Sequence, residues 1–491
     1  MLRLLAPFAL CCAVTLASCG RSAEGTLDLA IVSSEEELLA DGLRLSEPAQ
    51  HLRAATALGL VTRDAQGEII PGLADRWIVT DDGLSFIFRL RDGNWPDGTP
   101  LTAQSVRAAL LETMRGLDDT SMELDLGPVD EVRAMAGRVV ELRLSGPFPT
   151  LLQLLAQPEL ALKPAQGTGD MALTQEDHVE LLALKPPEDR GLADDSNWEQ
   201  DVRPIRLTAL SAARALAAFD QGRAQAVLGG KIDSLPLVDT GPLSRGTIRI
   251  DPAIGLFGLQ VQKGTGPLES VEVREALAMA IDRSALIARF GIGGWTPTTR
   301  IVNPGLADDP GYIFERWAGR TIDDLRAAAA RRVAAWKSRQ QGGPEGPVTL
   351  TLEIGSGPGY DLLFRELAAQ LGQIDIRLER AGEGERGDLL LIDRIARYAA
   401  PRWFLNQFHC SLRQGMCDED VDYLVELANE EHDLSVRAAL LAEAEAELAL
   451  SNIYIPFGTP LRWSLIRGTV DGFVPNRWAF HPLPPMAEIA R

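Results

Sequence analysis

The residue types that act as nucleophiles, bases and metal ligands occur in this chain without the spacing that catalysis needs. No serine stands in a G-x-S-x-G turn, and no H-E-x-x-H pair occurs. The Gly-rich stretches 291–295 and 355–360 lack the Lys-Ser/Thr of a phosphate-binding loop and the full dinucleotide spacing. The histidines are spread along the chain, at positions 51, 178, 409, 432 and 481. We therefore predict no enzymatic activity, no cofactor and no metal site. A hydrolase on an unfamiliar scaffold is the alternative, which a buried nucleophile–base pair would support.

Two cysteines lie close together in "HCSLRQGMC", Cys410 and Cys417, with His409 beside the first. In an oxidising compartment such a pair indicates a disulfide that closes a short loop. A metal site is the alternative. Three soft ligands within nine residues, with no second cluster of Cys or His, make a poor zinc site. We predict a Cys410–Cys417 disulfide.

The N-terminus has the form of an export signal. Arg3 gives a positive start, and residues 4–16 are apolar but too few to span a bilayer. The stretch "LASCG" resembles the lipobox of bacterial lipoproteins, in which the cysteine is lipidated and becomes the new N-terminus. The resemblance implies a lipoprotein signal peptide at 1–18, lipidation of Cys19, a tether at 19–25 and a periplasmic protein anchored to a membrane. A plain signal peptide is the alternative.

The bulk composition excludes some partners. A chain of 491 residues is too long for one core and predicts about three domains. Its formal net charge is −21, and no stripe of Lys and Arg appears. Because nucleic-acid binding needs clustered positive charge, we expect no nucleic-acid partner.

The elements that would position any site alternate between strand and helix. Residues 76–80 and 84–90 predict a hairpin around Asp81-Asp82-Gly83, and 102–114 predict a helix capped by Thr102. Residues 271–290 predict one amphipathic helix. The run 348–380 reads as strand, helix and strand, which is typical of a mostly parallel sheet.

One loop is unusually dense in turn residues. "RLRDGNWPDGTP", residues 89–100, holds two Asp-Gly pairs, a Trp and two prolines. Such residues predict tight turns, in which we expect the carboxylates of Asp92 and Asp97 to make local hydrogen bonds. Trp95 is expected in a core rather than in a ligand cleft.

Several segments, in order, resemble the bacterial extracellular solute-binding proteins of the peptide/nickel ABC-importer type. The centre of the match is "PGLADRWIVTDDGLSFIFRLRDGNWPDGTPLTAQSV", residues 71–106, although its turn is slightly shorter than in the family. "VREALAMAIDRSAL" at 273–286 resembles the family's characteristic helix, and "GTGDMAL" at 167–173 resembles a Gly-Thr-Gly-Pro-Tyr turn with two changes. The resemblance covers essentially all of the mature chain and identifies a divergent member.

The resemblance implies a fold and a mechanism. The fold is α/β, a two-lobed periplasmic-binding-protein fold of class II type and of the large cluster, with an extra subdomain inserted in the first lobe. The expected boundaries are 26–57 with 205–262 and 463–491 for lobe Ia, 58–204 for the inserted subdomain Ib, and 263–462 for lobe II. A ligand would be captured by hinge closure.

The resemblance also points to a binding segment. Peptide-binding relatives carry a motif W-x-A-D-Y-x-x-P whose Asp takes the α-ammonium of the peptide, and "RIARYAAPRWFL", residues 394–405, is the corresponding stretch. Arg397 stands where the acid would be, and Arg394 replaces the Trp. Arginine binds carboxylate, phosphate or sulfonate rather than ammonium. The hypothesis is that Arg397, with Arg394, clamps an anionic group while Tyr398 and Trp403 wall the pocket. The alternative is that the register is shifted and these are surface arginines.

The sequence thus predicts a lipid-anchored, monomeric substrate-binding component of an ABC importer. Its expected partners are the permease subunits, the membrane and a peptide-like or other small polar solute, with an anionic one as the further hypothesis. A solute sensor or envelope lipoprotein on the same fold is the alternative function.

Overall fold

The computed structural model describes residues 25–489 except 177–178, 240, 242–245, 307–308 and 341–345. The predicted signal peptide, Cys19 and the tether up to residue 24 lie outside the described residues. Among the described helices, none has the length and apolarity needed to cross a membrane.

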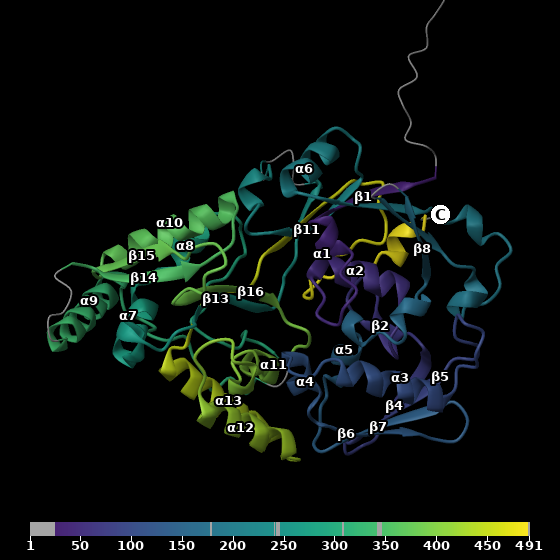
Figure 1. The fold of residues 1–491 in the computed structure, drawn as a ribbon, viewed down its shortest axis with the longest axis horizontal. Coiled ribbons are helices and arrows are strands. Elements are labelled where there is room, and N and C mark those ends of the chain that lie inside the picture. The colour runs from purple at the N-terminus through teal and green to yellow at the C-terminus, as the bar shows by residue number, and fades with distance from the viewer. Residues whose placement is uncertain are drawn as a thin grey trace, which may run out of the picture.

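A seven-stranded sheet forms the first lobe (Figure 1). Strand β1 runs parallel to β10 and β11, and the other neighbouring strands pair antiparallel. Across the sheet the order is β12 (Ile248–Ile250), β18 (Arg462–Ile466), β11 (Ala226–Lys231), β1 (Leu27–Val32), β10 (Ile205–Leu210), β9 (Val179–Leu184) and β8 (Met171–Glu176). The helices that pack on it are α1 (Glu35–Leu38), α2 (Glu47–Thr56), α6 (Ala212–Asp220) and α14 (Pro484–Ala487).

An inserted subdomain lies beside this lobe. Its antiparallel sheet has the order β4 (Ala74–Val79), β5 (Ser85–Leu90), β7 (Val139–Leu144) and β6 (Val129–Ala134). The remaining elements of the subdomain are the hairpin β2 (Val61–Arg63) and β3 (Ile69–Pro71) and the helices α3 (Ala103–Arg115), α4 (Ser121–Leu126) and α5 (Leu151–Leu155).

The second lobe is built on a five-stranded sheet. Its strands are, in order, β15 (Ile376–Arg380), β14 (Val348–Glu353), β16 (Leu389–Ile395), β13 (Gly255–Val261) and β17 (Tyr454–Gly458). Its helices are α7 (Val271–Ala280), α8 (Arg283–Ala288), α9 (Ile322–Arg339), α10 (Pro358–Gly372), α11 (Pro401–Asn406), α12 (Glu419–Glu430) and α13 (Leu434–Ser451).

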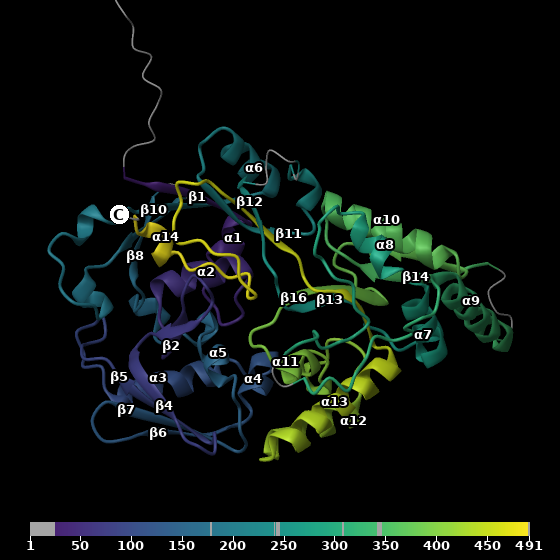
Figure 2. The same cartoon turned by 180° about the vertical axis from the view of Figure 1, so that it is seen from behind.

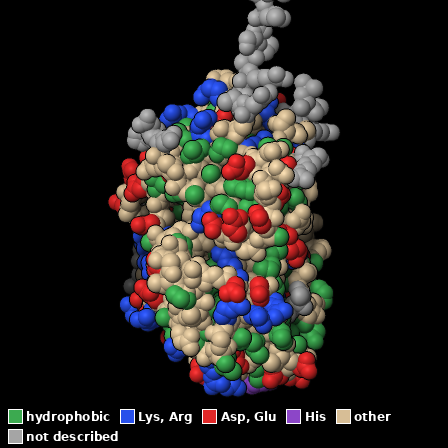
Figure 3. All heavy atoms as spheres, turned by 90° about the vertical axis from the view of Figure 1, so that its right-hand side faces the viewer, with side chains coloured by type: hydrophobic (Ala, Val, Ile, Leu, Met, Phe, Trp, Pro, Cys, Tyr) green, Lys and Arg blue, Asp and Glu red, His purple; other side chains and the backbone are tan. Residues whose placement is uncertain are grey.

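Two connections join the lobes. The chain leaves the first sheet after β12 and enters the second at β13, and it returns between β17 and β18 (Figure 2). One apolar core contains buried residues of both the inserted subdomain and the second lobe, such as Phe148 and Tyr398. The two parts are therefore packed against each other. On the face drawn in Figure 3, acidic and basic side chains are interspersed rather than segregated.

Local predictions from the sequence agree with this fold. Strands β4 and β5 form the predicted hairpin, and Thr102 caps α3 by accepting from the backbone N–H of Ser105. The run 348–380 forms β14, α10 and the parallel β15. The single helix predicted over 271–290 is wrong, because the backbone is extended at Ile281 and Asp282 and the Asp282 side chain caps a second helix, α8.

Strand pairing departs from the expected domain boundaries in two places. Strand β13 was expected in lobe Ia, but it lies inside the second sheet between β16 and β17. Strands β8 and β9 were expected in the inserted subdomain, but they extend the first sheet. A buried strand pattern predicts a strand without naming its neighbour, since pairing partners are set by tertiary packing.

The loop 89–100 bends at Asp92-Gly93 and forms one tight turn, closed by the Gly98 N–H donating to the Trp95 carbonyl at 2.9 Å. Gly93 and Gly98 have positive φ values of 142° and 82°, which glycine adopts without strain. Asp97 accepts from the Thr99 N–H at 2.9 Å, as predicted, whereas exposed Asp92 pairs with Arg138 at 3.1 Å. Trp95 is buried in the core of the inserted subdomain, and its Nε1 donates to Ser105 Oγ at 2.9 Å. This loop therefore shapes the subdomain.

Candidate functional site

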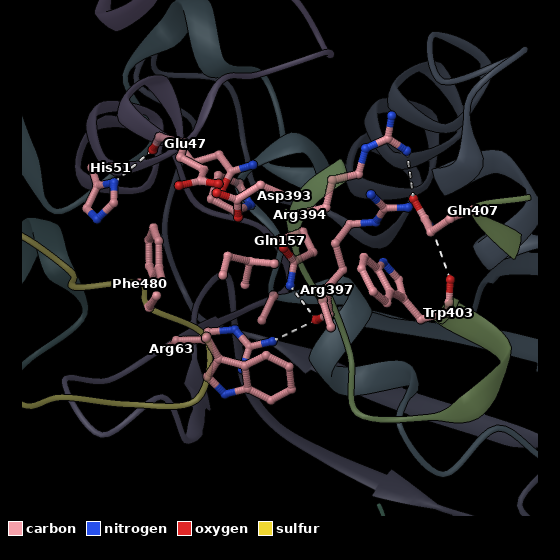
Figure 4. A pocket seen from close by; sticks show the side chains of 17 residues that line it. Glu47, His51, Arg63, Gln157, Asp393, Arg394, Arg397, Trp403, Gln407 and Phe480 are labelled. Atoms are coloured by element: carbon pink, nitrogen blue, oxygen red, sulfur yellow. Dashed lines mark hydrogen bonds between the residues drawn. The ribbon is translucent and has the colours of Figure 1, made fainter. Parts of the chain in front are cut away.

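A cavity of about 180 Å³ lies where the two lobes and the inserted subdomain meet (Figure 4). It is smaller than the roughly 300 Å³ at which pockets for drug-sized ligands begin. No Ser, Thr or Cys is among the lining residues that the structure describes. The labelled lining residues are Glu47, His51, Arg63, Gln157, Asp393, Arg394, Arg397, Trp403, Gln407 and Phe480.

Arg462, at the start of β18, holds two carboxylates at one side of the cavity. It donates to both oxygens of Glu47, at 2.9 and 2.6 Å, and to Asp393 Oδ1 at 2.7 Å. Burial raises the pKa of Glu47, but Arg462 and Lys231 outweigh this effect and lower that pKa to about 2. Because Glu47 belongs to the first lobe and Asp393 to the second, this ionic network joins the lobes.

Asp393 is only partly satisfied by Arg462. Its side chain is 7% exposed, and its Oδ2 receives no hydrogen bond from any residue that the structure describes. Burial raises the pKa of Asp393, against the opposing effect of Arg462. A buried oxygen without a donor costs about 1–3 kcal/mol, so a donor group on a ligand would be bound favourably here.

Arg397 is already paired with a carboxylate. Its guanidinium donates to Asp125 Oδ2 at 3.1 and 2.5 Å and to Ser121 Oγ at 2.8 Å. Asp125 lies in α4 of the inserted subdomain and is fully buried. The carbonyl of Arg397 accepts from Arg63 and Gln157, at 3.1 and 2.8 Å. Arg397 therefore fastens the second lobe to the inserted subdomain.

Tyr398 lies elsewhere than expected. Its side chain is fully buried, its hydroxyl donates to Asp125 Oδ1 at 2.9 Å, and its ring meets Phe148 edge-on. Tyr398 is not among the described lining residues, so the expectation that it walls the pocket is corrected. The physical reason is that its ring belongs to the core shared by the second lobe and the inserted subdomain.

Two other arginines of the wall pair with no carboxylate in the described residues. Arg394 donates to the amide oxygens of Gln407 and Gln414, at 3.5 and 3.2 Å. Burial and nearby Arg397 lower the pKa of Arg394. Arg63 donates to backbone carbonyls and lies 4.0 Å from the Trp478 ring centroid, and burial lowers its pKa to about 9. Their positive charge is available to an anion.

The structure therefore brings Arg394, Arg397 and Trp403 together at one cavity. Sequence reasoning missed Glu47, Asp393 and Arg462. Asp393 directly precedes Arg394 in the chain, which was a weak local signal. Nothing local pointed to Glu47 and Arg462, because they stand 415 positions apart in the chain and meet only in the fold.

A loop closed by the two cysteines borders the site. The sulfur atoms of Cys410 and Cys417 are 2.17 Å apart, the distance of a disulfide bond. The loop carries Gln414, which accepts from Arg394. His409 lies 3.7 Å from Asp422, and no group of three or more metal-ligating side chains is found in the described part of the chain.

Two α/β lobes that are joined by two crossing segments and enclose a polar cavity define a periplasmic-binding-protein fold. Residues 68–388 match the family model "Bacterial extracellular solute-binding proteins, family 5 Middle". The chain belongs to this family.

Known relatives agree with this assignment. The chain is 21% identical over 484 residues to the dipeptide-binding protein DppE of Bacillus subtilis, with 86% of each chain covered. It is 25% identical over 478 residues to YgiS of Escherichia coli, a probable deoxycholate-binding periplasmic protein, with 84% of each covered. The fold is similar to that of Haemophilus influenzae OppA in complex with RPPGFSPFR, with a TM-score of 0.78, 16% identity and coverage of 96% and 100%.

The family match establishes a solute-binding protein of the bacterial extracellular type. The family is one of extracellular or periplasmic solute binding rather than of catalysis.

Proposed function

We propose that this protein captures a small anionic solute in the cavity between its lobes and delivers it to an ABC permease. The observation that supports the proposal is the charge of the wall. Glu47 and Asp393 share Arg462, and Arg397 is neutralised by Asp125, whereas Arg63 and Arg394 have no carboxylate partner among the described residues. Guanidinium groups bind carboxylate, phosphate and sulfonate through charge-assisted hydrogen bonds.

The proposed clamp is Arg394 rather than Arg397. An arginine that is hydrogen-bonded to a buried carboxylate has no net charge left to offer, while Arg394 has only neutral amide partners. Trp403, 1% exposed, supplies an apolar wall beside it. The cavity volume supports a solute smaller than the peptide in the OppA complex.

Hinge closure is the proposed mechanism of capture. The lobes are joined by the chain between β12 and β13 and by the chain between β17 and β18, and such paired connections allow rigid lobes to rotate. Contacts across the lobes, such as Arg462 with Glu47 and Asp393, would form as the cavity closes.

Anchoring and oxidation complete the proposal. Cys19 carries the lipid that holds the protein at the membrane, and the protein works there as a monomer in the periplasm. The Cys410–Cys417 disulfide is formed in that oxidising compartment. A Cys19→Ala variant should move from the detergent phase to the aqueous phase in phase partitioning, and an unchanged distribution would refute lipidation.

The anionic solute is tested by native mass spectrometry and by titration. The purified protein should retain an anionic small molecule. The Arg394→Met variant should lose it, with affinity reduced by at least about tenfold, because a charge-assisted hydrogen bond contributes about 1.5–3 kcal/mol. Arg289→Met is the matched control, since Arg289 is an exposed arginine paired with Glu366. Unchanged retention by Arg394→Met would refute the clamp.

A further inference from the structure

The cavity wall contains an acceptor and a donor that the protein itself leaves unused. Asp393 Oδ2 and Trp403 Nε1 are both buried, and neither has a hydrogen-bond partner in the described residues. Both residues line the same cavity. Buried polar atoms are nearly always paired in folded proteins, so two unpaired atoms on residues that line one cavity are the atoms at which we expect a ligand to pair.

The acceptor and the donors lie on different sides of the cavity. Figure 4 shows Glu47 and Asp393 at one side, with the guanidinium groups of Arg394 and Arg397 and the Trp403 ring at the other. Asp393 Oδ1 is taken by Arg462 at 2.7 Å, so the side chain is held in place with Oδ2 free. An ionised carboxylate accepts hydrogen bonds and donates none. A ligand must therefore bring a donor, best a cationic one, to Asp393.

From this arrangement we infer that the ligand is an amino-acid-sized zwitterion, whose ammonium group binds Asp393 Oδ2 and whose anionic group binds Arg394 and Trp403 Nε1. The inference rests on the proposed function and adds the second charge to the ligand. The ammonium group would supply the donor that Asp393 Oδ2 lacks, while Arg462 keeps its contacts with Glu47 and with Asp393 Oδ1.

The volume of the cavity limits the ligand. About 180 Å³ accommodates a free amino acid, whereas each further peptide unit adds a residue's volume and two backbone polar groups that need partners. Asp393 is thus the proposed ammonium-binding residue, and it stands four positions before Arg397 in the chain.

The test is calorimetric titration of the purified protein after co-purified ligand has been removed by unfolding and refolding. The probes are the proteinogenic L-amino acids, the matched carboxylates that lack the amine, such as glutarate for L-glutamate, and trialanine. At least one amino acid should bind, and its carboxylate without the amine should bind at least about tenfold more weakly. Trialanine should not bind.

Asp393→Asn should weaken binding of the amino acid by at least about tenfold and should leave the matched carboxylate within about twofold. Asp361→Asn, at an exposed ion pair with Arg380, is the control and should change neither. A thermal melt checks that each variant is folded.

Three results would overturn the inference: equal affinity for the amino acid and its carboxylate, binding of trialanine as tight as that of any amino acid, or no binding by any amino acid. If the amino acid and its carboxylate bind equally well and both lose affinity in Arg394→Met, the proposal of an anionic solute is still supported. Amino-acid binding that depends on Asp393 but is unaffected by Arg394→Met refutes the clamp instead.

Discussion

Replacing Arg397 by Met tests whether this residue joins the lobes or binds the ligand. Asp125 has 0% exposure and accepts from Arg397, from the Tyr398 hydroxyl and from Asn406 Nδ2, the last two at 2.9 Å. Arg397→Met leaves the Asp125 carboxylate with two neutral side-chain donors. The guanidinium of Arg402 does not replace Arg397, because it donates to the backbone carbonyl of Asp125. Removing one partner of a buried ion pair costs about 3–5 kcal/mol.

The assay is a thermal melt combined with small-angle scattering. For a chain of this length each kcal/mol corresponds to roughly 1 °C, so the melting temperature should fall by about 3–5 °C. If the variant avoids this loss because the lobes separate and water reaches Asp125, the radius of gyration should rise. The double variant Arg397→Met with Asp125→Asn should recover most of the loss, because no unpaired buried charge remains.

Arg394→Met is the matched control, since Arg394 lines the same cavity without a carboxylate partner among the described residues, and its melting temperature should change by less than about 1 °C. The reasoning is refuted if Arg397→Met shows the wild-type melting temperature and radius of gyration. It is refuted equally if the double variant is as unstable as the sum of the two single ones.

Three further predictions concern His51, Trp95 and the disulfide. Burial lowers the pKa of His51 from 6.5 to about 4, so its contribution to stability is complete above about pH 6.5 and is lost as the pH falls toward 4. His51→Gln should therefore flatten the curve of stability against pH between about pH 4 and 6.5. An unchanged curve would contradict this prediction. Trp95→Ala should destabilise the inserted subdomain by about 3 kcal/mol or more in denaturant unfolding, whereas a change below about 1 kcal/mol would place the ring outside the core. Reduction of the Cys410–Cys417 disulfide should lower the free energy of unfolding by about 2 kcal/mol, because the short loop is no longer closed. It should also weaken ligand binding, because the loop carries Gln414, which accepts from Arg394. Detection of two free thiols in the untreated protein by mass spectrometry would contradict the disulfide.

Interactions between neighbours in the chain could be predicted because they need few residues. The hairpin of β4 and β5 follows from Asp81-Asp82-Gly83 between alternating residues, and the cap of α3 follows from Thr102 three positions before Ser105. The stretch 394–405 could also be named in advance as a place to look, and its residues Arg394, Arg397 and Trp403 line the cavity. The break between α7 and α8 was missed, because apolar residues at helical spacing continue on both sides of Asp282.

The roles of the arginines depended on the tertiary structure. The sequence by itself determined the family, the local elements and the stretch 394–405 as the place to look. It could not tell that Arg397 is neutralised by Asp125, 272 positions earlier, while Arg394 keeps its charge. Nor could it show that Arg462 holds Asp393 with one oxygen free. The physical reason is that a charged side chain is available to a ligand only when no buried counter-charge reaches it, and those counter-charges come from distant segments that meet only when the lobes pack together.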